Sequence, residues 1–584
     1  MPRLMICLAL SAALMGGGST AVLAQQAVTI NGVQAMEVVI APPDSPIASL
    51  IKDNLSKAYY GANPGSKAYA SAQKLYYFYG ARHFDPLWLT TAADGTASFS
   101  PAALKIIDVF KNASVEGFKT EDYLTPALDI AAAGNDPAKL AALESAFSAA
   151  TVHYAHDAYM GRVDPQDVSA DIDPESKQLD AADILAQLSQ SAAPDQVLAA
   201  LDPTDPEFGE LKVALSNIDK DDAGPAPIIV PPGKTLVPGM KDPRLATLRQ
   251  RLNVAAPAAP EVSADANGTA DAATPPVDTY DDTLVAAVKA FQKSAGLSAD
   301  GFVGPGTLAA LNYQPPKVSR NDIIANMERW RWLPHDLGQF HVMVNIPEFR
   351  VAVVENNAVD YSTRVVVGKP STPTPLFSNS IKNIVVNPYW NVPSSIVAKE
   401  IAPAMLRNPG YLAGQNMQIV SGNSVIDPSA IDWAGVSQAN WRYSIRQLPG
   451  GGNALGQIKF LFPNDHDVYL HDTPSKSLFA NAVRAYSHGC VRVQNPMDFA
   501  NALLKFEPGL TEDQLKAMFG NTEHWVNLKT HVPVHIAYFT VRADADGTLH
   551  SFADVYGHNK KLIDLLNGVG TAAARVSGPI VAGV

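Results

Sequence analysis

The spacing of apolar side chains changes along the chain, and the first part of the chain follows a helical period. Within residues 25–220, apolar residues recur three or four positions apart, as at Leu104, Ile107 and Phe110. Because residues at this spacing share one face of an α-helix, the pattern predicts a mostly helical scaffold domain. The aromatic run at residues 75–79 is more typical of a packed core than of a ligand platform.

A second and shorter helical pattern occupies residues 241–314. A proline-rich stretch at 221–240 precedes it and predicts a linker. Two amphipathic segments are separated by an Ala/Pro/Asp-rich stretch at 255–276, which predicts a flexible insertion. A glycine-punctuated turn at 296–305 then leads into a short helix. The pattern therefore predicts a small three-helix module.

The period changes to two within residues 337–545, where apolar and polar residues alternate in short runs separated by Pro, Asn and Gly. Examples of these runs are His341–Ile346 and Tyr361–Gly368. Alternation predicts half-buried strands and hence a β-rich domain. Helix-like and loop sequence at 393–446 interrupts the alternation and predicts an insertion near the functional site. The expected fold class is a multidomain α+β chain.

The two ends of the chain differ from these domains. Arg3, an apolar stretch at 4–15 and small residues before Gln25 predict a secretory signal peptide over residues 1–24. The apolar core is shorter than the about 20 residues that span a bilayer, which favours cleavage over a membrane anchor. We expect no membrane span after cleavage. Residues 546–584 are expected to form a C-terminal extension without an assigned role.

Charge and cysteine content narrow the function. The net charge of −13 and the lack of a Lys/Arg-rich run argue against a nucleic-acid partner. Cys7 lies in the predicted signal peptide, so the mature chain keeps a single thiol, Cys490. A lone thiol in an exported protein is an intermolecular partner, an inert buried residue or a reactive group.

The residues around Cys490 favour a reactive group. A thiol attacks a carbonyl as the thiolate, which an imidazole within hydrogen-bond reach supplies by taking the proton. Two histidines compete for this role. His488 lies two residues before Cys490 on the same loop or strand, whereas His471 comes from a separate strand and can approach the sulfur from across the site.

The backbone and charge next to the thiol fit acyl transfer. Gly489 permits close backbone approach, and the N–H groups of this turn can face an oxyanion. The positive charge of Arg492 favours the thiolate or binds a substrate carboxylate. The combination predicts an acyl-transferring cysteine enzyme, and a packing role for the cysteine is the alternative.

Three other motifs do not predict a metal or cofactor site. His153, His156 and Asp157 lack a convincing third ligand nearby, which favours a structural role. The glycine run at 450–456 lacks the Lys-Ser/Thr ending of a phosphate loop and leads into a strand. Residues 544–547 lack the bidentate Glu of a calcium loop and predict a hairpin turn. We therefore expect no metal and no cofactor.

His471, fifteen residues and then Ser-His-Gly-Cys resemble the signature of the L,D-transpeptidase (YkuD-type) family of bacterial cell-wall enzymes. The neighbouring sequences Asn387–Pro393, Pro449–Gly456 and Tyr469–Pro474 resemble its large periplasmic YcbB-like subgroup. The module at 241–314 is similar to peptidoglycan-binding modules found beside cell-wall enzymes. The resemblance implies a periplasmic enzyme.

The resemblance also implies a reaction. Cys490 would attack the carbonyl of the third residue of a stem tetrapeptide, usually meso-diaminopimelate, and release D-Ala. The side-chain amine of a second stem would resolve the thioester into a 3→3 cross-link. His471 would be the base, oriented by the backbone carbonyl of Asp472. Gly489, Cys490 and Tyr469 are the expected oxyanion residues.

Substrate-binding residues and partners follow from the same resemblance. The expected substrate-binding residues are Trp390, Asn391, Ser487, His488 and Arg492. The expected partners are the donor tetrapeptide and the acceptor amine of peptidoglycan stems, together with other cell-wall synthases. Carbapenems acylate members of this family. The insertion at 393–446 matches a capping subdomain that would exclude water and favour amine attack over hydrolysis.

Three other functions remain open from the sequence. An L,D-carboxypeptidase or hydrolase would use water in place of the acceptor amine. A related transferase would attach a protein to peptidoglycan. A non-catalytic cell-wall binding protein would work through the module at 241–314 alone.

Overall fold

The computed structural model describes residues 28–30, 33–35, 40–218, 228–255, 279–295, 297–313, 317–422 and 424–569. The predicted signal peptide, the predicted insertion beyond Ala255 and the end of the C-terminal extension from residue 570 lie outside the described residues. So does the first part of the predicted linker, residues 221–227. Near the start of the chain, β1 (Val28–Ile30) pairs antiparallel with β2 (Val33–Ala35).

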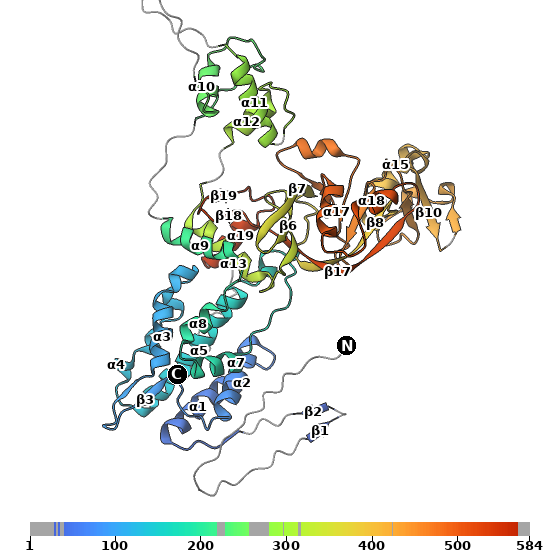
Figure 1. The fold of residues 1–584 in the computed structure, drawn as a ribbon. Coiled ribbons are helices and arrows are strands. Elements are labelled where there is room, and N and C mark those ends of the chain that lie inside the picture. The colour runs from blue at the N-terminus through green and yellow to red at the C-terminus, as the bar shows by residue number, and fades with distance from the viewer. Residues whose placement is uncertain are drawn as a thin grey trace, which may run out of the picture.

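The scaffold domain is helical, as predicted (Figure 1). Its main helices are α1 (Pro46–Gly61), α2 (Lys67–Gly80), α3 (Pro101–Lys111), α4 (Ile130–Ala133), α5 (Pro137–Met160), α6 (Pro165–Val168), α7 (Ala181–Gln190), α8 (Pro194–Ala199) and α9 (Pro206–Asn217). A hairpin of β3 (Leu89–Thr91) and β4 (Ala97–Phe99) interrupts them. Tyr79 of the aromatic run is fully buried in the core of this domain, together with Trp88.

The predicted helical spacing at Leu104, Ile107 and Phe110 corresponds to α3, but the buried stripe of this helix includes different residues. Ala103, Ile106 and Phe110 are fully buried, whereas Leu104 is 52% exposed. Both sets satisfy helical spacing through Phe110, so the periodicity identified the helix but not which stripe meets the core. Packing against the aromatic cluster of this domain settles the choice.

The small module consists of α10 (Arg244–Arg251), α11 (Asp282–Ser294) and α12 (Pro305–Asn312). Its core contains Leu245, Leu248, Leu284, Val288 and Leu311. The buried Gln292 fixes the glycine turn, because its side-chain oxygen accepts from Gly301 N (2.8 Å) and its amide donates to Asp300 (2.8 Å). The three predicted helices of this module are therefore confirmed.

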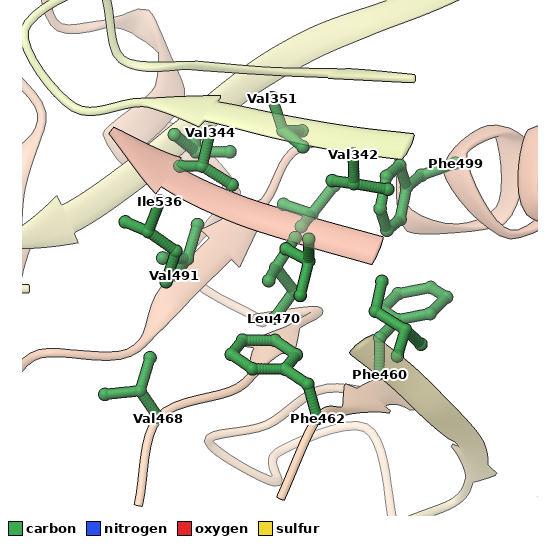
Figure 2. Close-up of a cluster of buried hydrophobic side chains, with 14 of the residues drawn as sticks. Val342, Val344, Val351, Phe460, Phe462, Val468, Leu470, Val491, Phe499 and Ile536 are labelled. Atoms are coloured by element: carbon green, nitrogen blue, oxygen red, sulfur yellow. The ribbon is translucent and has the colours of Figure 1, made fainter. Parts of the chain in front are cut away.

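The catalytic domain is built on a sheet whose strands, in the described part of the chain, follow the order β15-β7-β16-β14-β13-β8-β17-β5-β6. Pairing of β6 with β7 closes the sheet on itself. The strands are β5 (Phe340–Asn345), β6 (Arg350–Glu355), β7 (Ala358–Gly368), β8 (Ser378–Val386), β13 (Ile458–Leu461), β14 (Leu470–His471), β15 (Ala485–Ser487), β16 (Val491–Val493) and β17 (His524–Ala537). Apolar side chains from alternate positions fill its interior, including Val342, Phe460, Leu470 and Val491 (Figure 2).

A second sheet lies between β8 and β13 in the chain and forms the cap. Its strand order is β11-β10-β12-β9, with β9 (Trp390–Val392), β10 (Met417–Ser421), β11 (Ser424–Ile426) and β12 (Ser444–Gln447). Short helices α14 (Ser394–Ile396), α15 (Ala402–Arg407) and α16 (Tyr411–Gly414) and a π-helical turn at Val397–Ile401 accompany the sheet. Val397, Ile401 and Ile419 belong to a separate apolar core. The predicted insertion at 393–446 thus falls within a compact subdomain.

The remaining helices and strands surround the catalytic sheet. They are α13 (Arg320–Trp332), α17 (Pro496–Leu504), α18 (Glu512–Ala517), β18 (Val541–Ala543), β19 (Leu549–Ser551) and α19 (His558–Leu566). Residues 544–547 turn between β18 and β19, as the hairpin prediction states. Leu562 of α19 is fully buried in the main core, so this part of the C-terminal extension packs into the catalytic domain.

Buried ionic contacts join the scaffold domain to the catalytic domain. On α13, the side chain of Glu328 is fully buried and accepts a hydrogen bond from Val163 N (2.8 Å). Glu207 of α9 accepts from Arg542 Nε (2.9 Å) on β18. Buried charges need such partners because an unpaired charge is costly to desolvate. Across the described ranges, no helix combines the length and apolarity needed to cross a membrane.

Candidate active site

The alternation of β14 and β16 separates the site from the core. These strands run parallel, with Leu470 opposite Val491 and His471 opposite Arg492. Leu470 and Val491 point into the apolar interior (Figure 2). Because neighbouring strand residues face opposite sides, His471 and Arg492 share the outer face.

Cys490 lies immediately before β16 and beside Tyr469. Val491 N donates to Tyr469 O (3.2 Å), which continues the pairing to these two residues. The ring of Tyr469 lies 5.6 Å from the ring of His471 in an edge-on arrangement. The sheet therefore brings Cys490, Tyr469 and His471 together, although they come from two distant motifs of the sequence.

The Cys490 side chain is partly buried. Its Sγ donates to Asp467 O at 3.7 Å. Burial raises its pKa to about 11, and hydrogen bonds from the Tyr469 backbone and hydroxyl and the charge of Arg492 oppose that shift. The surroundings thus contain groups that would stabilise a thiolate once it forms.

The His471 imidazole is buried and held in one orientation. Its Nδ1 donates to the carbonyl oxygen of Asp472 (2.5 Å), which leaves Nε2 as the nitrogen that can accept a proton. Burial and the positive charge of Arg492 lower its pKa to about 3. The backbone carbonyls of Asp472 and Leu455 act in the opposite direction and raise the pKa. The ring is therefore neutral at physiological pH.

The carboxylate of Asp472 faces away from the imidazole. It accepts from Gln457 N (3.0 Å) and pairs with Lys476 Nζ (2.5 Å). A Cβ on Gly456, where φ is +62°, would lie 2.2 Å from the Asp472 carboxylate. Only glycine fits there, and only the backbone carbonyl of Asp472 meets His471.

The loop that carries Cys490 is shaped by Ser487. Its hydroxyl donates to Cys490 O (2.5 Å) and accepts from Gly489 N (3.1 Å). The Gly489 N–H, predicted to face an oxyanion, is therefore engaged within the loop. Among the described residues, no acceptor bonds the N–H of Cys490, which leaves it as the available backbone donor of this turn.

A second layer of hydrogen bonds supports this loop, and the sequence analysis did not identify it. Thr374 Oγ1 donates to Gly489 O (2.7 Å). The hydroxyl of Tyr556 donates to Gly368 O (2.7 Å) and accepts from Thr374 N (3.2 Å). Tyr556 lies in the segment predicted as an extension without a role, and no local motif could have indicated its contact with residues so distant in the chain.

The structure separates the two candidate histidines. His488 is exposed, and its Nε2 lies 2.7 Å from Glu400 Oε1 in the π-helical turn of the cap and 3.4 Å from Lys369 Nζ. His488 thus contacts the cap, whereas His471 lies beside Tyr469. Its assignment as a substrate-binding residue stays a prediction.

Trp390 and Asn391 lie at the root of the cap sheet. Both belong to β9 and pair with Gln447 and Arg446 of β12. Trp390 packs partly against the apolar core of the cap, and Asn391 is exposed. A substrate that contacts these two residues, as predicted, would contact the cap where its sheet begins.

The histidine pair of the scaffold has a structural environment. Asp157 is buried, accepts from the Tyr123 hydroxyl (2.8 Å) and lies 3.2 Å from His153. Within the part of the chain that the structure describes, no group of three or more His, Cys, Asp or Glu side chains is arranged to hold a metal ion.

Three segments of the chain match known domain families. Residues 339–535 match the L,D-transpeptidase catalytic domain (YkuD), residues 73–215 match a scaffold domain and residues 243–311 match a putative peptidoglycan-binding domain. A putative L,D-transpeptidase of Haemophilus influenzae is 33% identical over 241 residues, which cover 41% of this chain and 48% of that protein. The match thus spans about half the length of this relative.

Solved structures give weaker similarity. L,D-transpeptidase 3 from Mycobacterium tuberculosis, in complex with a faropenem-derived adduct, is 13% identical over 34% of this chain and 60% of that chain, with a TM-score of 0.17. An L,D-transpeptidase fragment from Xylanimonas cellulosilytica is 17% identical over 52% of this chain and 98% of that chain, with a TM-score of 0.15. Scores this low carry no structural argument.

Proposed function

We propose, from the premise that residues 339–535 form a YkuD-type L,D-transpeptidase catalytic domain, that this chain is a cysteine acyltransferase that cross-links peptidoglycan stem peptides. The observation that carries the proposal is the fixed tautomer of His471. With Nδ1 bound to the Asp472 carbonyl, Nε2 is left as the base on the outer face, which His471 shares with Arg492 and, by strand alternation, with Cys490.

The first half-reaction forms a thioester. Rotation of the Cys490 side chain away from Asp467 O lets its proton pass to His471 Nε2. The sulfur attacks the carbonyl of the third stem residue. The free N–H of Cys490 donates a hydrogen bond to the oxyanion that forms. The C–N bond to D-Ala then breaks, and the departing amine takes the proton from the imidazolium.

The second half-reaction transfers the acyl group to an amine. The side-chain amine of a second stem attacks the thioester carbonyl, and His471 takes a proton from that amine. The C–S bond breaks and the thiolate leaves, stabilised by Tyr469 and Arg492. The imidazolium then returns this proton to the sulfur, which restores the thiol and the neutral imidazole. The product is a 3→3 cross-link.

Water is the competitor of the acceptor amine, and the cap is the feature that favours the amine. A subdomain that closes over the thioester would exclude water and slow hydrolysis. The test is to incubate the purified protein with disaccharide-tetrapeptide and analyse the products by mass. Cross-linked dimer supports transpeptidation. Tripeptide alone would instead support a carboxypeptidase, and an unchanged substrate would favour a binding protein.

The setting of the reaction is part of the same proposal. The predicted signal peptide favours export to the periplasm, where the peptidoglycan-binding domain at 243–311 would hold the enzyme near its substrate. Other cell-wall synthases would supply stems, and acylation of Cys490 by carbapenems is expected. Use of a protein as the acceptor is tested by adding a candidate acceptor protein to the same assay, where transfer would place the muropeptide on the added protein.

A further inference from the structure

One row of side chains crosses the outer face of the catalytic sheet and ends at the active site. The pairings place Trp525 of β17 opposite Val385 of β8, and Val385 opposite Lys459 of β13. Lys459 in turn lies opposite His471, and His471 opposite Arg492. Because directly paired residues point to the same side of a sheet, Lys459 and Arg492 flank the candidate base on its two sides.

Lys459 is a buried cation without an anionic partner. The residue is only 8% exposed, and its Nζ lies 5.9 Å from the centre of the Tyr469 ring and 5.5 Å from that of Trp525. Among the described residues, no oxygen accepts a hydrogen bond from this Nζ or forms an ion pair with it. The nitrogen is not among the fully buried polar atoms that lack a partner, so the tip of the side chain reaches the surface, where an anion can meet it.

The nearest source of negative charge is already used elsewhere. Glu523 acts electrostatically on Lys459. However, its two carboxylate oxygens accept from Tyr389 N (2.9 Å) and from Trp525 Nε1 (2.9 Å). Glu523 therefore fixes the Trp525 ring over the ammonium and leaves the three donors of the ammonium unused.

Arg492, the cation on the other side of His471, also has a nitrogen without a hydrogen-bond partner. The Nε of Arg492 is buried and has no hydrogen-bond partner in the described part of the chain. The thiolate of Cys490 is the anion that Arg492 faces during catalysis. For Lys459, the described residues provide the distant charge of Glu523 but no ion pair, so its ammonium is available to an anion of the substrate.

We propose that Lys459, between the rings of Tyr469 and Trp525, binds a free carboxylate of the stem peptide, namely the carboxylate on the carbon that bears the reacting nitrogen. The inference rests on the proposed function. The two aromatic rings stabilise the ammonium by cation–π interaction while no substrate is bound, and the carboxylate adds charge-assisted hydrogen bonds.

The chemistry of both half-reactions supplies this group. The leaving D-Ala carries its carboxylate on the carbon next to the departing nitrogen. The D-centre of an acceptor diaminopimelate carries a carboxylate next to the attacking nitrogen. Since the amine that enters occupies the position that the leaving amine vacates, one lysine can bind the carboxylate in both steps. Water lacks this carboxylate, so the subsite would also select amine acceptors over hydrolysis.

The test compares substrates that differ only in this charge. Thioester formation on Cys490 is followed by intact mass with donors that end in D-Ala or in D-Ala carboxamide. We expect the wild-type protein to prefer the free carboxylate in kcat/KM. Lys459→Gln should lose about 10- to 100-fold on the carboxylate donor with little change on the carboxamide, as expected for a lost hydrogen bond to a charged group. Lys459→Arg should retain most of the preference.

The readout is the ratio between the two donors, because Lys459 also lowers the pKa of His471. A change in that pKa affects both donors alike and cancels in the ratio. A second arm starts from the preformed thioester and compares acceptors with a free or an amidated D-centre carboxylate. If Lys459→Gln lowers the preference for the free carboxylate in the first arm, Lys459 binds the carboxylate of the leaving group. If it lowers that preference in the second arm, Lys459 binds the carboxylate of the acceptor.

The control variant changes an exposed lysine far from Lys459 in the sequence. Lys561→Gln, on the exposed face of α19, should behave like the wild type in both arms. Ratios that Lys459→Gln leaves unchanged in both arms, in a protein that still forms the thioester, would overturn the proposal alone. A wild-type protein that forms no thioester with either donor would overturn the proposed function, and this inference with it.

Discussion

Glu400 Oε1 and His488 Nε2 lie 2.7 Å apart, and this contact ties the cap to the loop that carries Cys490. Glu400 belongs to the π-helical turn at Val397–Ile401, a rare geometry that often marks functional sites. The contact links the position of the cap to a residue two positions before Cys490.

Glu400→Gln should loosen this contact and admit water to the thioester. Contacts between exposed polar groups of this kind contribute up to about 1 kcal/mol, so we expect hydrolysed tripeptide to rise relative to cross-linked dimer by up to about fivefold. Quantitative mass analysis of both products measures the ratio. Lys399→Gln, on the neighbouring exposed residue, is the control. Equal ratios in the two variants would argue against a role of this contact in excluding water.

The titration of Cys490 gives a pH prediction. Its pKa of about 11 means that the free enzyme holds the thiol in its protonated form at neutral pH. Alkylation by iodoacetamide should therefore accelerate about tenfold per pH unit between pH 7 and 10, because the thiolate is the nucleophile. Intact mass at a series of pH values measures the rate. A plateau reached below pH 8 would contradict this account of the resting thiol.

Arg492→Gln should raise the pKa of Cys490 and the pKa of His471. The charge of Arg492 lowers the pKa of Cys490 and the pKa of His471, so its removal raises both values. At pH 8 the thiolate fraction falls, and alkylation of Cys490 should become slower than in the wild type. Arg442→Gln, on an exposed part of the cap, should leave the rate unchanged. Faster alkylation of the Arg492 variant would reverse the sign that we assign.

The sequence predicted much of the fold, because its signals are local. Alternating residues such as those of His341–Ile346 and Tyr361–Gly368 identified strands of the sheet. Helical spacing identified α3 and the small module. Which stripe of α3 is buried, that of Leu104 or that of Ile106, depends on packing partners that spacing alone does not encode.

The candidate site was only partly predictable for a related reason. Cys490 and His471 stand in compact motifs, so their chemistry is visible in the sequence. The contact of His488 with Glu400, the support of the loop by Tyr556 and the row through Lys459 join residues from distant segments. Strand register decides these neighbours, and a single sequence does not fix which strands pair.

Tyr556→Phe tests the support of the loop that carries Cys490. The variant loses the hydroxyl that bonds Gly368 O and Thr374 N, and leaving such groups unsatisfied costs about 1–3 kcal/mol. We expect a lower Tm and slower formation of the thioester. Calorimetry and intact mass measure the two effects. Tyr313→Phe, whose side chain is 52% exposed, is the control, and a Tyr556 variant equal to it would exclude this supporting role.

Replacement of each histidine tests the choice of the base. His471→Ala removes the only imidazole that the Asp472 carbonyl orients, and thioester formation should be abolished. His488→Ala should retain part of the activity, because that ring lies at the cap. Single-turnover acylation with the donor tetrapeptide measures both. Loss of the thioester in the His488 variant, with His471→Ala still active, would refute the assignment.

The most direct measurement of the central claim is the site of covalent modification during turnover. The protein is incubated with the donor tetrapeptide, quenched in acid and mapped by peptide mass. We predict an acyl adduct that lacks the terminal D-Ala on the peptide that contains Cys490, and no adduct in Cys490→Ala. An adduct on another residue, or cross-linked product formed by the Cys490→Ala protein, would contradict the account.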